Sequence, residues 1–176
     1  MADVALTLDE LVKVWFELPR DDHWPSVTSE GLWAVAVGAQ AVRLDNTPWL
    51  ARDVACGDLF RVRRADDGLL WATEKLRWSG RCTIRVVPLP DGALEGSGQR
   101  VIDAFAPLGV SGEGIEQYGM IALDIPSDVD LATVKRLLRA GQDDGRWTYE
   151  ERCIGDAWLN ADRDGPSDRP PHRPTR

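Results

Sequence analysis

RCTIRVV, residues 81–87, is the stretch at which the spacing of apolar residues along the chain changes. Upstream, short segments alternate between apolar and polar residues and are separated by turn residues. Downstream, segments with helical spacing are interleaved with further strands. Alternation with a period of two is typical of a half-buried strand, and spacings of three and four are typical of an amphipathic helix. The stretch fits both the end of the first series and the start of the second, so we expect both halves to share it.

The residues before this stretch predict a small antiparallel sheet. LVKVWFEL alternates, with its apolar residues at positions 12, 14, 16 and 18 on one face. Asp67-Gly68 marks a hairpin, because this pair tolerates the positive φ angles that such turns demand. Strands are expected at 11–18, 31–37, 41–44, 59–63, 69–78 and 81–87. About six short strands with regular turn signals predict a strongly curved, barrel-like sheet.

The residues after it predict two helices and three more strands. Ser97 is a candidate N-cap for a helix that runs to Leu108. Asp130 is a candidate N-cap for a second helix, 131–140, which Gly141 is expected to end. Strands are expected at 112–117, 120–125 and 147–154. With 81–87 counted first, the order is β-α-β-β-α-β, the ferredoxin-like arrangement. The predicted fold class is therefore α+β: an N-terminal small antiparallel β-barrel-like sheet followed by a ferredoxin-like βαββαβ half.

These patterns divide the chain into three segments. We expect a β-rich, barrel-like half over 1–90 and a ferredoxin-like half over 81–159, with the strand 81–87 common to both. From 160 to 176 the sequence NADRDGPSDRPPHRPTR has four prolines, mixed charge and one apolar residue. Such a composition buries too little apolar surface to offset the entropy of ordering, so this segment is expected to be a disordered tail.

Composition limits the cellular compartments and the kinds of partner that are expected for this protein. The formal net charge is −8, which disfavours a general affinity for nucleic-acid phosphates or anionic lipid. The N-terminus has no basic segment before an apolar run, and no stretch approaches the ~18 apolar residues of a membrane span. Cys56, Cys82 and Cys153 are odd in number and form no C-x-x-C pair, which indicates reduced, packed thiols. We expect a cytoplasmic protein; its oligomeric state stays open, since the last strand offers an edge.

The residues supply no assembled catalytic set. His172 lies in the predicted tail, and His23 lies in a polar loop, DDHWP. Asp21, Asp22 and His23 could contact a metal, but three consecutive residues rarely all face one ion. No G-x-S-x-G, P-loop or G-x-G-x-x-G motif is present. The paired carboxylates fall in turns or, at Glu150-Glu151, on opposite faces of a strand. We therefore expect no catalytic residue, no metal and no cofactor, and favour a protein that is not an enzyme.

A run of cationic residues follows the strands of the first half. Its members are Arg61, Arg63, Arg64, Lys75, Arg77, Arg81 and Arg85. The run fits either a solvated sheet face or a surface for an acidic or phosphate-bearing partner, and both interpretations stay open.

RLDNTPWLARDVACGDLFRV, residues 43–62, sets polar residues among apolar ones. One interpretation is two strands and the turns that join them, with Asp45 and Asn46 bonded to local backbone. The other is a ligand site with a tryptophan wall between the two halves, a preferred location for pockets. The candidate binding residues under that interpretation are Asp45, Asn46, Trp49, Asp58 and Trp71.

Four segments, VWFELP, GLWAVAVG, RLDNTPWLARDVACGDLFRV and GRWTYEERC, together resemble a bacterial family, domain of unknown function 4265. The resemblance extends from Val12 to Ile154 and is most specific in the third segment. The signature residues that it implies are Asp45, Asn46, Pro48, Gly57 and Asp58. The family brings no established activity, and Trp49 stands where its members often have Phe, which implies a packing role.

Eight tryptophans and an acidic net charge favour a binding or regulatory protein that acts through a protein partner. An inhibitor or immunity type is suggested by analogy alone. The alternative is an enzyme or small-ligand-binding protein with its site between the two halves.

Overall fold

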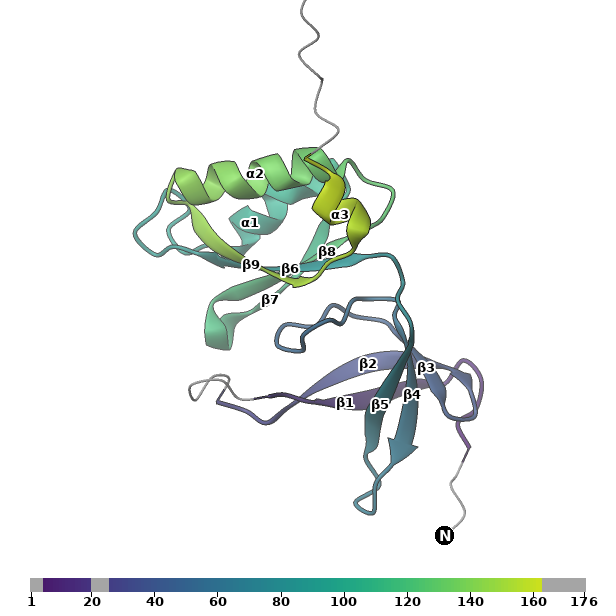
Figure 1. Ribbon diagram of the computed structural model, residues 1–176. Coiled ribbons are helices and arrows are strands. Elements are labelled where there is room, and N and C mark those ends of the chain that lie inside the picture. The colour runs from purple at the N-terminus through teal and green to yellow at the C-terminus, as the bar shows by residue number, and fades with distance from the viewer. Residues whose placement is uncertain (1–4, 20–25, 163–176) are drawn as a thin grey trace, which may run out of the picture.

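The computed structural model describes residues 5–19 and 26–162, which are arranged in two layers (Figure 1). The first five strands form a closed barrel, and the four that follow form a second sheet. Two helices cover the face of the second sheet that points away from the barrel. The α+β prediction, with a barrel-like sheet in the N-terminal half, is confirmed.

The barrel consists of five strands in sequential order. They are β1 (Leu11–Glu17), β2 (Ser29–Gly38), β3 (Ala41–Leu44), β4 (Leu59–Arg64) and β5 (Leu70–Arg77). Consecutive strands are antiparallel, but β1 and β5 close the barrel as a parallel pair, with Val14 opposite Leu70. The prediction of an antiparallel sheet is wrong at this closure. Turn residues mark only pairings between consecutive strands, and a parallel pair has no such turn.

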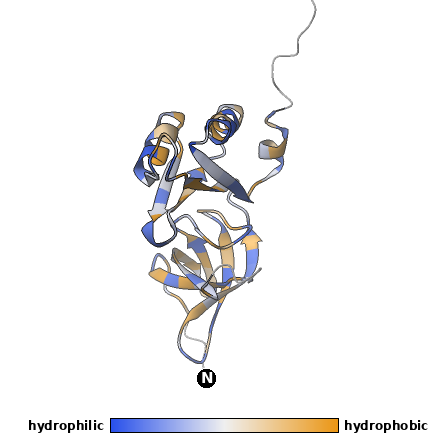
Figure 2. Cartoon of the chain, turned by 90° about the vertical axis from the view of Figure 1, so that its left-hand side faces the viewer, coloured by the Kyte–Doolittle hydropathy of each residue, from blue (hydrophilic) through white to orange (hydrophobic). Residues whose placement is uncertain are grey.

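Alternation along the strands fills the barrel. Val12, Val14 and Phe16 of β1 are buried, as predicted. Phe16 meets Phe60 of β4 edge to face, with ring centroids 4.9 Å apart, a geometry that aromatic pairs prefer. In Figure 2 the barrel strands carry hydrophobic and hydrophilic residues next to one another, as expected for strands with one buried face.

The second sheet is ferredoxin-like. Its strands are β6 (Cys82–Pro88), β7 (Ser111–Ile115), β8 (Met120–Ile125) and β9 (Trp147–Cys153), in the order β7-β8-β6-β9. Helix α1 (Gly98–Phe105) lies between β6 and β7 in the chain, and α2 (Leu131–Asp143) lies between β8 and β9. Short 3-10 helices occupy Ala106–Leu108 and Glu116–Tyr118. The predicted β-α-β-β-α-β order is confirmed. Sharing of the strand 81–87 is not found, because β6 pairs with β8 and β9 and the barrel closes without it.

The two long helices begin as predicted, but the second ends later. The side chains of Ser97 and Asp130 accept N–H groups in the first turns of α1 and α2. Helix α2 continues through Gly141 to Asp143, which corrects the prediction that Gly141 ends it. A Cβ atom at position 141 would lie 2.0 Å from the ring of Trp147. Packing against this indole therefore requires the glycine, and no turn is made there.

A third helix, α3 (Asp156–Asn160), is not predicted by the sequence pattern. Five residues are too few to show a helical period. Trp158 anchors this helix, since its side chain is buried and its carbonyl accepts from the buried Lys135 Nζ at 2.9 Å. The expected tail begins at 160, which is still helical, and residues 163–176 lie outside the described part of the chain. No helix within that described part has the length and apolarity to cross a bilayer.

Candidate functional site

The loop between β3 and β4, residues 45–58, lies between the two layers and bonds to both (Figure 1). We call it the junction loop. The indole N–H of Trp49 donates to a carbonyl of β7 at 2.9 Å. The N–H of Asp53 donates to the carbonyl of Arg152 on β9 at 2.9 Å, and the hydroxyl of Thr83 on β6 donates to a loop carbonyl at 3.0 Å. Three strands of the second sheet are thus joined to the barrel through this loop.

Glu30 of β2 holds the middle of the junction loop from inside the barrel. Its carboxylate is buried and accepts the N–H groups of Trp49, Leu50 and Ala51 at 2.7, 3.1 and 2.7 Å. Burial raises the pKa of Glu30 above its usual 4.5, and the three N–H donors act in the opposite direction. Glu30 is not among the residues predicted from the sequence. The alternation along β2 could have indicated it, because Glu30 and Leu32 are two residues apart and therefore point to the same inward face of the strand.

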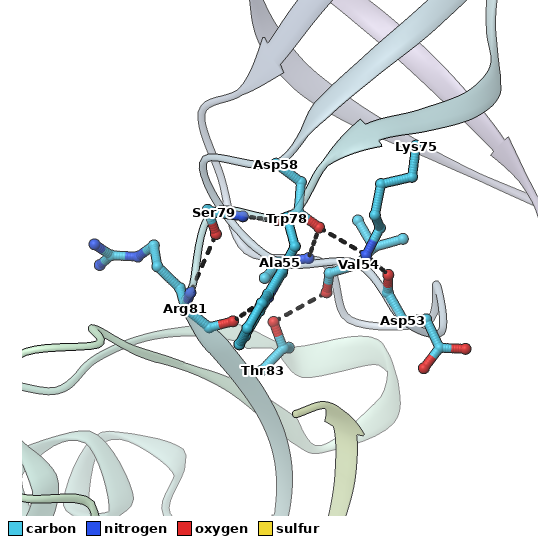
Figure 3. A network of polar contacts seen from close by, with 9 residues as sticks. All are labelled: Asp53, Val54, Ala55, Asp58, Lys75, Trp78, Ser79, Arg81 and Thr83. Carbon is cyan, nitrogen blue, oxygen red and sulfur yellow. Dashed lines mark hydrogen bonds and ion pairs between the residues drawn. The ribbon is translucent and has the colours of Figure 1, made fainter. Parts of the chain in front are cut away.

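Asp58 holds the end of the junction loop, at the point where the barrel connects to the second sheet (Figure 3). Its side chain is fully buried and accepts the N–H groups of Ala55 at 3.0 Å and Ser79 at 2.8 Å. Lys75 Nζ lies 3.0 Å from the same carboxylate and also donates to the carbonyl of Asp53. Asp58 therefore ties together the junction loop, strand β5 and the linker to β6.

Asp45 and Asn46 fix the backbone of Trp33 on β2. The N–H of Asp45 donates to the Trp33 carbonyl at 2.9 Å, and the Trp33 N–H donates to Asn46 Oδ1 at 2.8 Å. The expectation of a bond to local backbone is wrong for Asn46, whose partner lies on the neighbouring strand. These two bonds continue the pairing of β2 with β3 beyond Leu44. The motif thereby sets the position of Trp33.

The five predicted binding residues do not converge on one place. Asp45 and Asn46 follow β3, Trp49 contacts β7, and Asp58 is buried at the base of the junction loop. Trp71 lies on β5 in the barrel wall. Backbone N–H groups engage the side chains of both Asn46 and Asp58. A ligand-binding role for these residues stays a prediction.

Trp71 belongs to a group of tryptophans on the outer wall of the barrel. Trp15 of β1 is paired with Trp71 of β5, and their ring centroids are 6.5 Å apart. Lys13 of β1 is paired with Trp33 of β2, and its Nζ lies 5.2 Å from the Trp15 ring and 5.8 Å from the Trp33 ring. The side chain of Trp33 is 48% exposed. We call Lys13, Trp15, Trp33 and Trp71 the aromatic wall.

The residues next to the aromatic wall do not cover its side chains. Gly31 lies opposite Trp15, and a Cβ atom there would lie 2.6 Å from the Lys13 side chain and 3.2 Å from the Trp15 ring. The missing side chain gives both groups room to lie along the strand. Leu11 and Val37 occupy outward positions of β1 and β2 and are exposed. The wall thus continues into further apolar surface.

The run of cationic residues predicted along the strands is largely engaged within the chain. The pairs are Arg61 with Glu74, Arg64 with the Gly68 carbonyl, Lys75 with Asp58, Arg81 with Asp124 and Arg85 with Glu150. Five of the seven cations therefore have intramolecular partners.

A charged cluster lies on the face of the second sheet that looks toward the barrel. Arg85 of β6 and Glu150 of β9 are cross-strand partners and form an ion pair. The second oxygen of Glu150 accepts from Arg152 at 3.0 Å, and Arg152 also donates to the Leu50 carbonyl at 2.6 Å. Burial acts to raise the pKa of Glu150, but the two guanidinium groups hold it below its usual value. Burial, followed by the Arg85 cation, lowers the pKa of Arg152.

The three cysteines are free thiols, and two of them, Cys82 and Cys153, are buried. Burial raises the pKa of Cys56 and of Cys153 to about 11, and it also raises the pKa of Cys82. The reactive species is the thiolate, so these raised pKa values disfavour nucleophilic reaction of the thiols near neutral pH. Within residues 5–19 and 26–162, no three His, Cys, Asp or Glu side chains are grouped to hold a metal ion. His23 and His172 lie outside the described residues.

Known proteins resemble this chain in fold and in sequence. The crystal structure of a hypothetical protein from Neisseria gonorrhoeae has a TM-score of 0.68 at 18% identity, covering 83% of this chain and 96% of that chain. At this identity the likeness shows a common fold. No curated protein matches the sequence. The family model described as domain of unknown function (DUF4265) matches residues 30–149, which include the junction loop, Trp33 and Trp71. On this match over more than half of its length, the chain belongs to the DUF4265 family.

Proposed function

We propose that this protein is a non-enzymatic binding protein that docks a protein partner on its aromatic wall. The observation that carries the proposal is the adjacency of Trp15, Trp33 and Trp71 on an outward face, with 48% of Trp33 exposed. Tryptophan is enriched at the energetic centres of protein interfaces. The solvent-facing positions of an antiparallel sheet are usually polar, so folding alone does not require indoles there. Exposed apolar patches are typical of contact surfaces, which supports the proposal.

The partner is expected to present apolar side chains and a carboxylate. Lys13 lies among the indoles, with its ammonium group within 6 Å of two rings, and a carboxylate is its natural counter-ion. A protein is favoured over nucleic acid for two reasons. The chain carries a formal charge of −8, and most of the cations along the barrel strands already have partners.

A regulatory protein of the bacterial cytoplasm is the specific form of this proposal. The free thiols accord with a reducing compartment. The signature residue Asn46 bonds the backbone of Trp33, so the family motif and the docking face are physically connected.

Affinity purification of the full-length chain, with matched variants, tests the proposal. The native chain should retain one protein in stoichiometric amount. Trp33→Ala should weaken retention by about 30-fold or more, the range of a hot-spot residue. Lys13→Glu should do the same by repelling a carboxylate. Leu159→Ala removes an exposed apolar side chain on α3 and should leave retention unchanged.

Two outcomes contradict the proposal. One is a partner retained equally by the native chain, Trp33→Ala and Lys13→Glu, because the contact then lies elsewhere. The other is retention of nucleic acid and no protein.

A further inference from the structure

The outward face of strand β1 carries a positive charge, an indole and a negative charge in a row. Every second residue of β1 is buried in the barrel, so Lys13, Trp15 and Glu17 point outward. At about 3.3 Å per residue, each charge lies about 7 Å along the strand from Trp15. Both charged residues are exposed, and neither forms an ion pair with another residue in 5–19 or 26–162. This row is complementary to its own reverse.

A two-fold axis through Trp15, in the plane of contact and perpendicular to β1, matches these charges. It lays β1 of a second copy antiparallel over β1 of the first, so that Lys13 of each copy faces Glu17 of the other. In an isologous contact this pairing occurs twice. An axis along the strand would instead place each charge over its own counterpart, which is repulsive. The charges therefore select the antiparallel arrangement.

The strands beside β1 fit the same axis. Trp33 of β2 lies opposite Lys13, and Ser29 lies opposite Glu17. The arrangement that brings Lys13 over Glu17 therefore brings the exposed indole of Trp33 over the small side chain of Ser29 in the other copy. Trp71 of β5 lies beside Trp15 and close to the axis, where indoles of the two copies can meet in the offset or edge-to-face geometries that aromatic rings prefer.

We propose that the aromatic wall packs against the aromatic wall of a second copy of this chain, which makes the protein a two-fold symmetric dimer. The inference rests on the proposed docking function and names its partner. The wall requires apolar side chains and a carboxylate, and Trp15 and Glu17 of a second copy supply both. A uniformly acidic partner would satisfy Lys13 but repel Glu17, and is disfavoured. Because the barrel is closed, the second copy meets its face and adds no strand to it.

Sedimentation velocity of the purified full-length chain, over about a hundredfold range of concentration, tests this inference. The native chain should shift from monomer to dimer as its concentration rises. Lys13→Glu and Glu17→Lys should each weaken dimerisation by about tenfold or more, because each replaces two attractive contacts by two repulsive ones. Arg136→Glu makes the same change of charge at an exposed position of α2 and should leave dimerisation unchanged.

An equimolar mixture of Lys13→Glu and Glu17→Lys tests the two-fold axis itself. One copy then carries glutamate at both positions and the other carries lysine at both, so both contacts become attractive and the mixture should dimerise again. The double variant Lys13→Glu/Glu17→Lys should dimerise by itself for the same reason. Recovery on mixing also excludes misfolding as the cause of the loss in either single variant.

Three results overturn the inference. They are a native chain that stays monomeric, single variants that dimerise as tightly as the native chain, and a mixture that is no more dimeric than its components. A monomeric native chain that retains a different protein through Trp33 overturns the dimer alone and leaves the proposed function standing. Retention that Trp33→Ala does not weaken contradicts the proposed function, so the two failures are distinguished.

Discussion

Replacing Asp58 by Ala is expected to lower the free energy of unfolding by about 3–5 kcal/mol, the range for breaking a buried ion pair. The carboxylate is fully buried and has three partners between 2.8 and 3.0 Å. Truncation leaves the N–H groups of Ala55 and Ser79 without an acceptor, at about 1–3 kcal/mol each. It also leaves Lys75 without its carboxylate. The loss concerns the junction of barrel and second sheet, so both halves should be affected.

Two matched variants separate the parts of this effect. Asp58→Asn removes the charge but keeps one acceptor oxygen, so one of the two N–H bonds survives and about half of the loss is expected. Asp66→Ala lies in an exposed hairpin turn and should stay within about 0.5 kcal/mol of the native chain.

Urea unfolding followed by tryptophan fluorescence measures all three variants. With a slope of about 1–3 kcal/mol/M, a loss of 3 kcal/mol moves the midpoint by roughly 1 M or more. The reasoning is refuted if Asp58→Ala and Asp66→Ala have similar urea midpoints at an unchanged slope. Asp58 would then not stabilise the connection between the barrel and the second sheet.

Other perturbations follow from the same contacts. Glu30→Gln should flatten the pH dependence of stability. Protonation of Glu30, whose folded pKa is raised, favours the folded state below pH 4.5, and this contribution is lost as the pH rises through the folded pKa. The native-minus-variant difference in urea midpoint should therefore fall as the pH rises above 4.5, and a constant difference contradicts the reasoning. Gly141→Ala should destabilise by more than about 2 kcal/mol in thermal melts, because its Cβ would meet the Trp147 ring; Ala140→Gly, on the exposed side of α2, should cost only about 1 kcal/mol. Iodoacetamide should modify Cys56 at pH 8 about 200-fold more slowly than a free thiol of pKa about 8.5, because its thiolate fraction is that much smaller. Similar rates would contradict the raised pKa of Cys56.

Local pattern accounts for most of the elements. The phase of β1, the N-caps Ser97 and Asp130, and the βαββαβ order are all determined by residues close in sequence. The closing parallel pair of β1 with β5 is not, because it depends on how far the whole sheet curls. The role of Gly141 is predicted wrongly for a similar reason. A glycine near the end of a helical pattern usually ends the helix, whereas this glycine is required by the close packing of the Trp147 indole.

The candidate sites depend even more on long-range register. The aromatic wall needs Trp15 of β1 beside Trp71 of β5, a pairing that only the closed barrel creates. The charged cluster needs β6 and β9 aligned so that Arg85 faces Glu150. Trp71 is among the candidate binding residues predicted from the sequence, but its pairing with Trp15 is not predicted. The strand phase alone indicates the face of each tryptophan, but not which strands lie side by side.

Site-specific photo-crosslinking tests docking at the aromatic wall most directly. A photoreactive phenylalanine analogue at position 33 keeps an aromatic ring on the exposed face of β2, and the same analogue at position 159 on α3 serves as the control. Irradiation of cells that produce each chain should give one discrete protein adduct at position 33 and none at position 159. No adduct at position 33, or the same adducts at both positions, contradicts the assignment of the wall as the docking surface.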